Sequence, residues 1–101
     1  MITLRVKQYT SIKNKTLGLI GHKKPEAIMF LTRFGIHTFG LKFQIDIVIL
    51  NNKNVVVKVK EKLNPNNLFF WPICYQKVLE LPAGTIQKQK IKIGNKLNLK
   101  P

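Results

Sequence analysis

Apolar and polar positions alternate along most of this chain, and the alternation predicts short β-strands joined by tight turns. At the amino terminus Ile2, Leu4 and Val6 alternate with polar residues, which is typical of a half-buried strand. Residues 45–50, IDIVIL, are β-branched and apolar on both faces, so we predict the central strand there. Further strands are predicted at residues 27–31, 35–39, 77–81 and 96–99.

Two asparagine-rich turns bracket a strand with an unusual charge pattern. Asn51–Asn54 and Asn64–Asn67 are typical turn sequences, because asparagine tolerates left-handed backbone. Between them, valines alternate with Lys58, Lys60 and Lys62. The pattern predicts a strand with one buried face and one wet, basic face.

Two segments have helical signals. Residues 16–20 can form a short helix capped by Thr16 and ended by Gly21. Residues 84–92 are ambiguous, since their alternation suggests a strand while Gly84-Thr85 can begin a helix. Gly94 is expected to supply a positive-φ turn before the last strand.

Two sequence blocks, GIHTFGLKFQIDIVIL (35–50) and VLELPAGT (78–85), resemble the signature of a family called domain of unknown function 192. This bacterial and archaeal family has no securely assigned reaction. The positions that match its most recognisable motif are His37, Thr38, Leu41, Lys42, Phe43, Ile45 and Asp46. The resemblance extends from about Thr16 onward and favours a short helix at residues 85–90 over the strand.

The chain departs from the family pattern at three positions. Gln44 stands where proline is usual, Asn95 where aspartate is usual, and His22 where arginine is common. These changes leave the expected fold intact. They weaken any shared ligand site that uses the arginine or aspartate charge.

The fold predicted from these elements is mainly β. With 101 residues the chain is expected to form a single domain, residues 1–101. We expect a small, partly closed β-barrel of about six or seven short strands with one or two short helices. Closure would remove exposed edge strands.

The charge of the chain favours anionic partners. The net charge is +14, from 18 basic and 4 acidic residues. A field of that sign attracts polyanions. Arginine, which makes bidentate contacts to phosphate and guanine, occurs only at Arg5 and Arg33. The sequence therefore leaves two interpretations open, which are nonspecific nucleic-acid binding through Lys58, Lys60 and Lys62 and a merely solvated basic surface.

Asp46 is the residue whose position most needs an explanation. A carboxylate inside an apolar strand is costly unless it is hydrogen-bonded, so we predict that Asp46 is buried and bonded. His37 is expected on a neighbouring strand, where the pair would form a buried network or line a pocket. Catalysis is the third and least favoured interpretation of this pair. Ser11 is the only serine, and no nucleophile motif accompanies His37 and Asp46.

Cys74 and the aromatic segment at residues 69–75 are the remaining candidates. Cys74 is expected to be a small buried hydrophobe, and no Cys/His spacing suggests zinc. The aromatic cluster, formed by Phe69, Phe70, Trp71 and Tyr75, is expected either to close one end of the barrel or to supply an exposed binding rim.

The leading functional hypothesis is a non-enzymatic binding or accessory module without a cofactor or metal. Its candidate pocket residues are His37, Thr38, Lys42, Asp46 and Trp71. A hydrolytic enzyme is the weakest alternative. No apolar run approaches the ~20 residues of a membrane helix, and the pattern at the amino terminus predicts a strand and not a signal peptide. A cytoplasmic protein is therefore expected. The expected partner is a small molecule or a protein.

Overall fold

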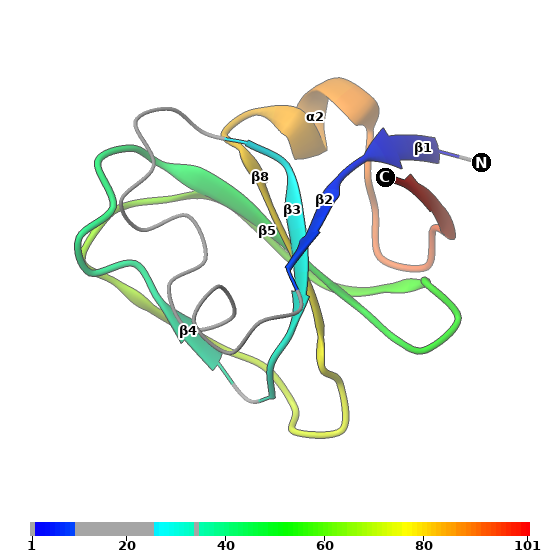
Figure 1. The fold of residues 1–101 in the computed structure, drawn as a ribbon, viewed down its shortest axis with the longest axis horizontal. Coiled ribbons are helices and arrows are strands. Elements are labelled where there is room, and N and C mark those ends of the chain that lie inside the picture. Colours follow the sequence, from blue (N-terminus) through cyan, green and yellow to red (C-terminus); the bar gives the residue numbers. More distant parts are fainter. Residues whose placement is uncertain (1, 10–25, 34) are drawn as a thin grey trace.

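The computed structural model describes residues 2–9, 26–33 and 35–101, and within them the chain is mainly β (Figure 1). The elements in chain order are β1 (Ile2–Arg5), β2 (Lys7–Tyr9), β3 (Ile28–Leu31), β4 (Gly35–His37), β5 (Ile45–Leu50), β6 (Val56–Leu63), β7 (Leu68–Phe70), β8 (Lys77–Pro82), α2 (Thr85–Gln89) and β9 (Leu97–Lys100). The predicted helix at residues 16–20 lies outside the described residues, as do Ser11 and His22.

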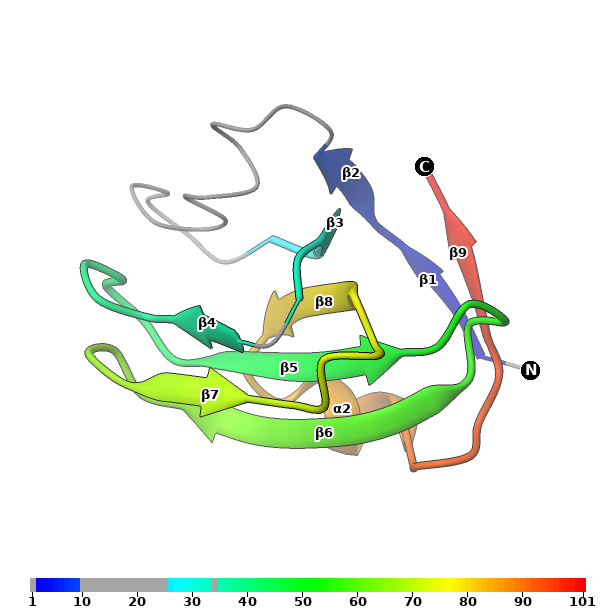
Figure 2. The same ribbon diagram turned by 90° about the horizontal axis from the view of Figure 1, so that it is seen from below.

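The largest sheet has the strand order β2-β3-β8-β5-β6, and β5 lies between two antiparallel neighbours (Figure 2). Every residue of β5 is buried, which confirms the predicted central strand. Its side chains alternate between two apolar clusters. Val48 and Leu50 belong to one cluster, with the helix residue Ile86, whereas Ile45, Ile47 and Ile49 belong to the other.

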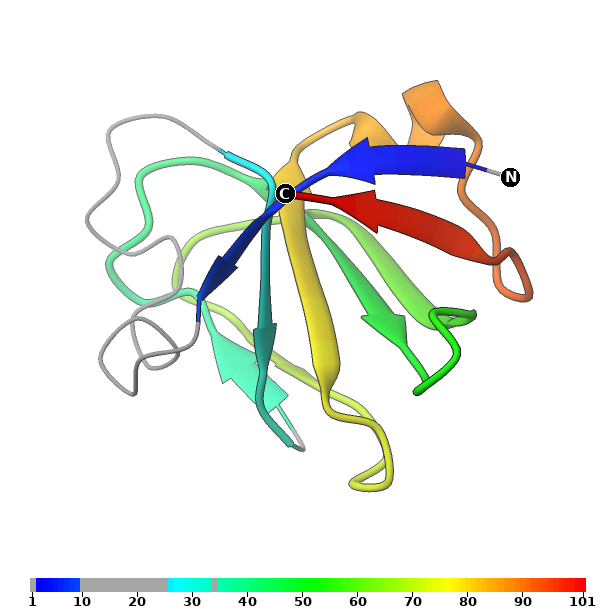
Figure 3. The same ribbon diagram turned by 45° about the vertical axis from the view of Figure 1, so that its right-hand side comes forward.

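Two smaller two-stranded sheets complete the described fold. β1 and β9 pair in parallel, and Figure 3 shows them side by side. β4 and β7 pair antiparallel and form the ribbon at the other side of the large sheet. Backbone bonds from Val6 N to Lys100 O (2.8 Å) and from Lys7 N to Ala27 O (2.9 Å) connect the first sheet to the large one. The strands are nevertheless three distinct sheets, so the partly closed barrel stays a prediction.

The asparagine turns form as predicted. Asn54 and Asn66 adopt left-handed backbone, with φ of 62° and 63°. In the first turn, Asn51 Oδ1 accepts hydrogen bonds from Lys53 N (2.9 Å) and Val55 N (3.0 Å). The side chain therefore satisfies the backbone of the hairpin that joins β5 to β6.

The ambiguous segment after β8 is a helix, which confirms the interpretation favoured by the family resemblance. α2 begins after Gly84 (φ 94°) and ends at Lys90, which is left-handed (φ 56°). Gly94 (φ 96°) supplies the predicted turn before β9. The strand-like alternation misleads because Gln87, Lys88 and Gln89 are all exposed. An alternation of polar residues with other polar residues gives a strand nothing to bury.

The ribbon depends on a close approach that only glycine permits. Gly35 pairs with Phe70, and a Cβ added at Gly35 would lie 2.5 Å from Phe70 Cδ1 and 2.9 Å from the backbone oxygen of Phe69.

We expect Gly35→Ala to displace β4 from β7 and to cost about 1–3 kcal/mol of unfolding free energy. Denaturant unfolding checks this, with Gly94→Ala as the comparison, because that change meets only backbone strain and no neighbouring atom within 4 Å. Unchanged stability and unchanged exchange of the ribbon amides in Gly35→Ala would contradict the packing.

Candidate functional site

Asp46 is fully buried and accepts three backbone hydrogen bonds, as the sequence predicted. Its Oδ1 accepts from Lys62 N (2.9 Å), and its Oδ2 accepts from Gly84 N (3.1 Å) and Ile86 N (2.8 Å). The last two donors belong to the start of α2, where Gly84 offers no capping side chain. Asp46 thus caps a helix that lies far from it in sequence.

A β-bulge brings the third donor to Asp46. Ile45 pairs with Leu63 but Ile47 pairs with Lys60, so β6 carries one extra residue opposite Asp46. Lys62 has a φ of 51°, and its N–H points to the carboxylate. Asp46 therefore joins β5, β6 and α2, and both of its oxygens are engaged in structural bonds.

Thr38 is also buried and structural. Its hydroxyl donates to Asn64 O (2.7 Å) and accepts from Asn67 N (2.8 Å). Its backbone N–H donates to Asn67 O (2.9 Å), and its carbonyl accepts from Asn66 N (3.0 Å). These bonds fasten the turn before β7 to the end of β4, which fixes the position of the ribbon.

His37 does not meet Asp46, so the expected pairing of the two residues is wrong. β4 pairs with β7 and not with β5, and the turns after Thr38 separate the two residues. The His37 side chain is exposed. Its Nδ1 accepts from Phe39 N (3.3 Å), and its ring stacks on Phe39 with centroids 5.2 Å apart.

The other pocket candidates also fail to converge. Trp71 is buried, and its indole N–H donates to Tyr75 O (2.8 Å), so it closes the core instead of forming a rim. Lys42 is exposed. Cys74 is exposed as well, which corrects the expected burial. The segment after Trp71 turns away from the core. The apolar residues beside Cys74 in the sequence did not indicate that turn.

The basic face of β6 is partly covered. Lys58 Nζ donates to Phe70 O (2.7 Å) and lies 5.0 Å from the centre of the Phe69 ring. Lys60 and Lys62 are exposed, but Lys62 lies at the bulge, where regular alternation ends. The predicted row of three free ammonium groups is therefore reduced to Lys60 and Lys62, because Lys58 attaches β6 to β7.

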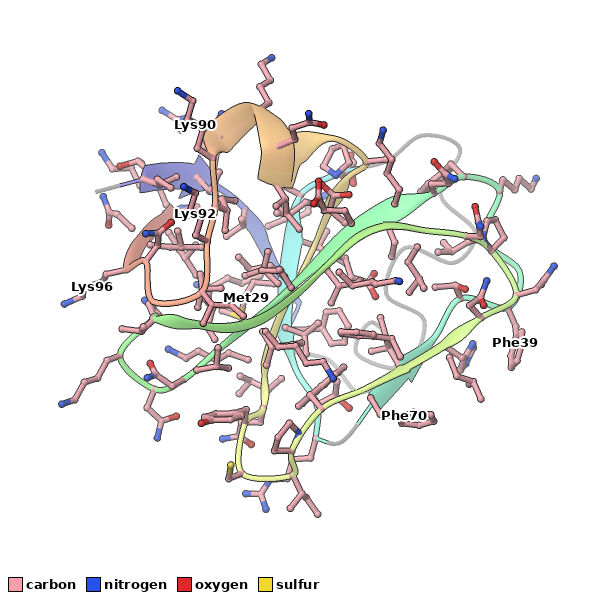
Figure 4. All side chains as sticks on the ribbon, turned by 180° about the vertical axis from the view of Figure 1, so that it is seen from behind. Met29, Phe39, Phe70, Lys90, Lys92 and Lys96 are labelled. Carbon is pink, nitrogen blue, oxygen red and sulfur yellow. The ribbon has the colours of Figure 1, made fainter. Side chains whose placement is uncertain are left out.

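Three large apolar side chains are exposed on or beside the outer face of the ribbon. Phe39, Leu68 and Phe70 are 49%, 55% and 46% exposed. Leu68 lies opposite His37 across the strand pair, so both side chains share this face. We call His37, Phe39, Leu68 and Phe70 the ribbon patch, and Figure 4 shows Phe39 and Phe70 on the same side of the molecule.

Sequence reasoning found only part of this patch. The aromatic cluster was expected either to close the barrel or to supply an exposed rim, and Phe70 is its exposed member whereas Trp71 is buried. Sequence reasoning missed Phe39 and Leu68, because their grouping depends on which strand β4 pairs with. The alternation of Phe69 and Phe70 was the available signal, since Phe69 packs on the core while Phe70 faces outward.

Two surface hollows in the described part of the chain are lined by other residues. One of about 520 Å³ is open and is lined by Glu61, Ile86, Gln87, Lys90, Ile91 and Lys92. Another, of about 380 Å³, is lined by Arg5, Val6, Lys7, Glu26, Ala27 and Pro101. Neither includes a predicted pocket residue. Across residues 2–9, 26–33 and 35–101, no three His, Cys, Asp or Glu side chains are grouped to hold a metal ion.

The family model of DUF192, described as "Uncharacterized ACR", matches residues 2–99. The chain belongs to the DUF192 family. The resemblance carried by the motif around His37 and Asp46 is thereby confirmed, and it extends to the first strand. No curated protein matches this DUF192 chain.

Two solved structures have the same fold as this DUF192 protein. A protein of unknown function from Novosphingobium aromaticivorans DSM 12444 superposes with a TM-score of 0.71 and 16% identity, over 93% of this chain and 71% of that one. A protein described as a "putative transcription regulator" from Sinorhizobium meliloti 1021 superposes with a TM-score of 0.69 and 15% identity, over 93% and 78%. At these identities the likeness shows the fold alone. None of the described helices is long and apolar enough to cross a membrane.

Asp46→Ala should destabilise the protein by about 2–4 kcal/mol, because three backbone N–H groups lose their acceptor. Urea unfolding measures the loss, and hydrogen exchange should show faster exchange at Lys62, Gly84 and Ile86. Glu61→Gln, at an exposed carboxylate of the neighbouring strand β6, is the matched control and should stay within about 0.5 kcal/mol of the unchanged protein. Equal unfolding midpoints for Asp46→Ala and the control would refute the structural role.

Proposed function

We propose that this DUF192 protein is a non-enzymatic binding module whose docking site is the ribbon patch. The observation that carries the proposal is the exposure of three large apolar side chains, Phe39, Leu68 and Phe70, at one place. Contiguous exposed apolar surface on a small protein is typical of an interaction site. Aromatic residues are also enriched at the centres of protein interfaces.

The occupant that fits the patch is an apolar segment of a partner protein flanked by acidic residues. Phe39, Leu68 and Phe70 line neither of the hollows described above, and an exposed apolar surface suits a protein segment better than a small molecule. The net charge of +14 favours acidic residues at the rim of the contact. Lys42 is three residues after Phe39 in the sequence, and its side chain is exposed and can contact such acidic residues.

Two sets of bonds hold the patch in place before any partner binds. Thr38 fastens the end of β4 to the turn that precedes β7. Lys58 Nζ donates to the backbone oxygen of Phe70 at the other end of β7. A surface that is already ordered loses less conformational entropy on binding. Thr38 and Lys58 thus serve the site as support, while His37 and Lys42 are the candidates for direct contact.

We further infer that the three sheets act as one partly closed barrel in a single domain. Backbone bonds from Val56 N to Asn95 O and from Leu97 N to Asn54 O (2.8 and 2.9 Å) support this, since they connect the hairpin after β5 to the segment that leads into β9. The bonds from Val6 and Lys7 support the opposite seam. Such a frame would keep the ribbon and the opposite end of the molecule at a fixed separation.

Polyanion binding through β6 is the second candidate, and the exposure of Lys60 and Lys62 supports it. The engagement of Lys58 with Phe70 and the ring of Phe69 argues against a site made of all three lysines. A hydrolytic enzyme is the weakest candidate, because His37 is exposed and its Nδ1 already accepts a hydrogen bond from the backbone N–H of Phe39.

A photo-crosslinking residue placed at Phe39 or at Phe70 should capture the same partner protein in cells that produce this chain. The matched control is the same residue placed at Ile93, which is 65% exposed and lies on the segment between α2 and β9. With the captured partner purified, Leu68→Ser should weaken binding about tenfold or more, because burying such a side chain contributes about 1.5–3 kcal/mol. Ile93→Ser should not weaken it.

Three outcomes would reject the docking site. They are equal capture from Ile93, adducts formed only with a second copy of this chain, and unchanged affinity in Leu68→Ser. Thermal unfolding of each variant excludes loss of the fold as the cause. A hydrolase substrate screen of the native protein and His37→Ala, with turnover that vanishes in the variant at unchanged stability, would instead favour the enzyme.

A further inference from the structure

The segment that joins α2 to β9 combines exposed lysines with an exposed isoleucine. Lys88, Lys90, Lys92 and Lys96 are all exposed. Ile93 lies among them and is 65% exposed. No other large apolar side chain in the described residues is more exposed. Figure 4 shows Lys90, Lys92 and Lys96 along one side of the molecule. We call these four lysines and Ile93 the basic tip.

The basic tip is held in shape by backbone bonds and by one buried side chain. Ile91 is buried and its N–H donates to Ile86 O (2.9 Å), which attaches the segment to the core. Lys92 N donates to Asn95 Oδ1 (2.7 Å), and Gly94 N donates to Val56 O (2.8 Å). The turn at Gly94, with φ of 96°, therefore presents Ile93 outward from an ordered frame.

Few negative charges lie near enough to neutralise the tip. Of the four carboxylates, Asp46 and Glu80 are buried. Glu61 lines the hollow beside Lys90 and Lys92, and Glu26 lines a different hollow with Arg5 and Lys7. The tip thus has a clear excess of positive charge, and an anionic surface is its counterpart by charge complementarity.

The isoleucine decides which anionic surface fits best. A nucleic acid offers phosphates for the lysines, but single strands are bound through aromatic stacking, and this tip has no aromatic residue. An anionic bilayer offers headgroups for ammonium groups and, just beneath them, an apolar layer for an aliphatic side chain. Lysines around an exposed aliphatic residue match that layered arrangement.

We propose that the basic tip docks this protein on anionic lipid bilayers, with Ile93 in the boundary between headgroups and acyl chains and the lysines against the headgroups. The attachment is peripheral and reversible. Lys90, Lys92 and Lys96 lie on the left of Figure 4, whereas Phe39 and Phe70 lie on its right. A protein docked through the tip therefore leaves the ribbon patch facing away from the membrane, so the two contacts are independent.

Vesicle flotation tests the proposal directly. Vesicles of 70% phosphatidylcholine and 30% phosphatidylglycerol should bind the protein in low salt, and pure phosphatidylcholine vesicles should not. Each lysine near an anionic bilayer contributes about a fivefold gain in affinity, so the triple variant Lys90→Gln, Lys92→Gln, Lys96→Gln should lose roughly a hundredfold. Ile93→Ser should lose about tenfold while its charge stays unchanged.

The matched control is the triple variant Lys42→Gln, Lys60→Gln, Lys62→Gln, which removes the same charge from other exposed positions. It should lose less than about fivefold. Equal losses in the two triple variants would show that net charge alone attracts the vesicles and would overturn the proposal. Wild-type affinity in Ile93→Ser would overturn it too, as would tighter binding to single-stranded RNA than to the anionic vesicles. Loss of the ribbon-patch partner in Leu68→Ser leaves this assay unaffected, so the two proposals fail separately.

Discussion

The carboxylate of Asp46 is the constraint on which the described fold depends. It lies in the most buried strand, and it is tolerated there because three backbone N–H groups surround it. Those donors come from the bulge in β6 and from the start of α2, which has no capping side chain of its own. One charged residue thus fixes the helix, the bulge and the central strand relative to each other. A buried network that is fully satisfied specifies a single arrangement.

Because Asp46, Thr38 and Trp71 use their polar atoms within the fold, the binding surfaces that we propose are external. Thr38 and Trp71 repeat the pattern of Asp46 on a smaller scale, since each uses its polar atoms on backbone partners. The side chains left exposed are apolar on the ribbon and basic at the tip. The sequence motif that identifies the family therefore marks residues that build the frame, and His37 is its exposed member.

Lys58 shows how a charged residue can belong to both a surface and a core. Its ammonium group lies over the Phe69 ring and donates to the backbone oxygen of Phe70. Long side chains of this kind cover apolar surface while their charge stays near water. The lysine alternation of β6 is therefore only in part a solvated face, and the bulge near Lys62 interrupts it further.

Local pattern alone determined the identity of most strands, the two asparagine turns and the burial of Asp46, because each depends on residues that are neighbours in sequence. The helix at Thr85–Gln89 needed the family resemblance, since its polar residues alternate without an apolar face. Only the tertiary structure decided that β4 pairs with β7, and hence that His37 faces outward while Phe39, Leu68 and Phe70 gather beside it. It also decided that Cys74 is exposed and Trp71 buried. Strand pairing is a long-range choice, and the period of a single strand shows which residues share a face without showing what that face meets.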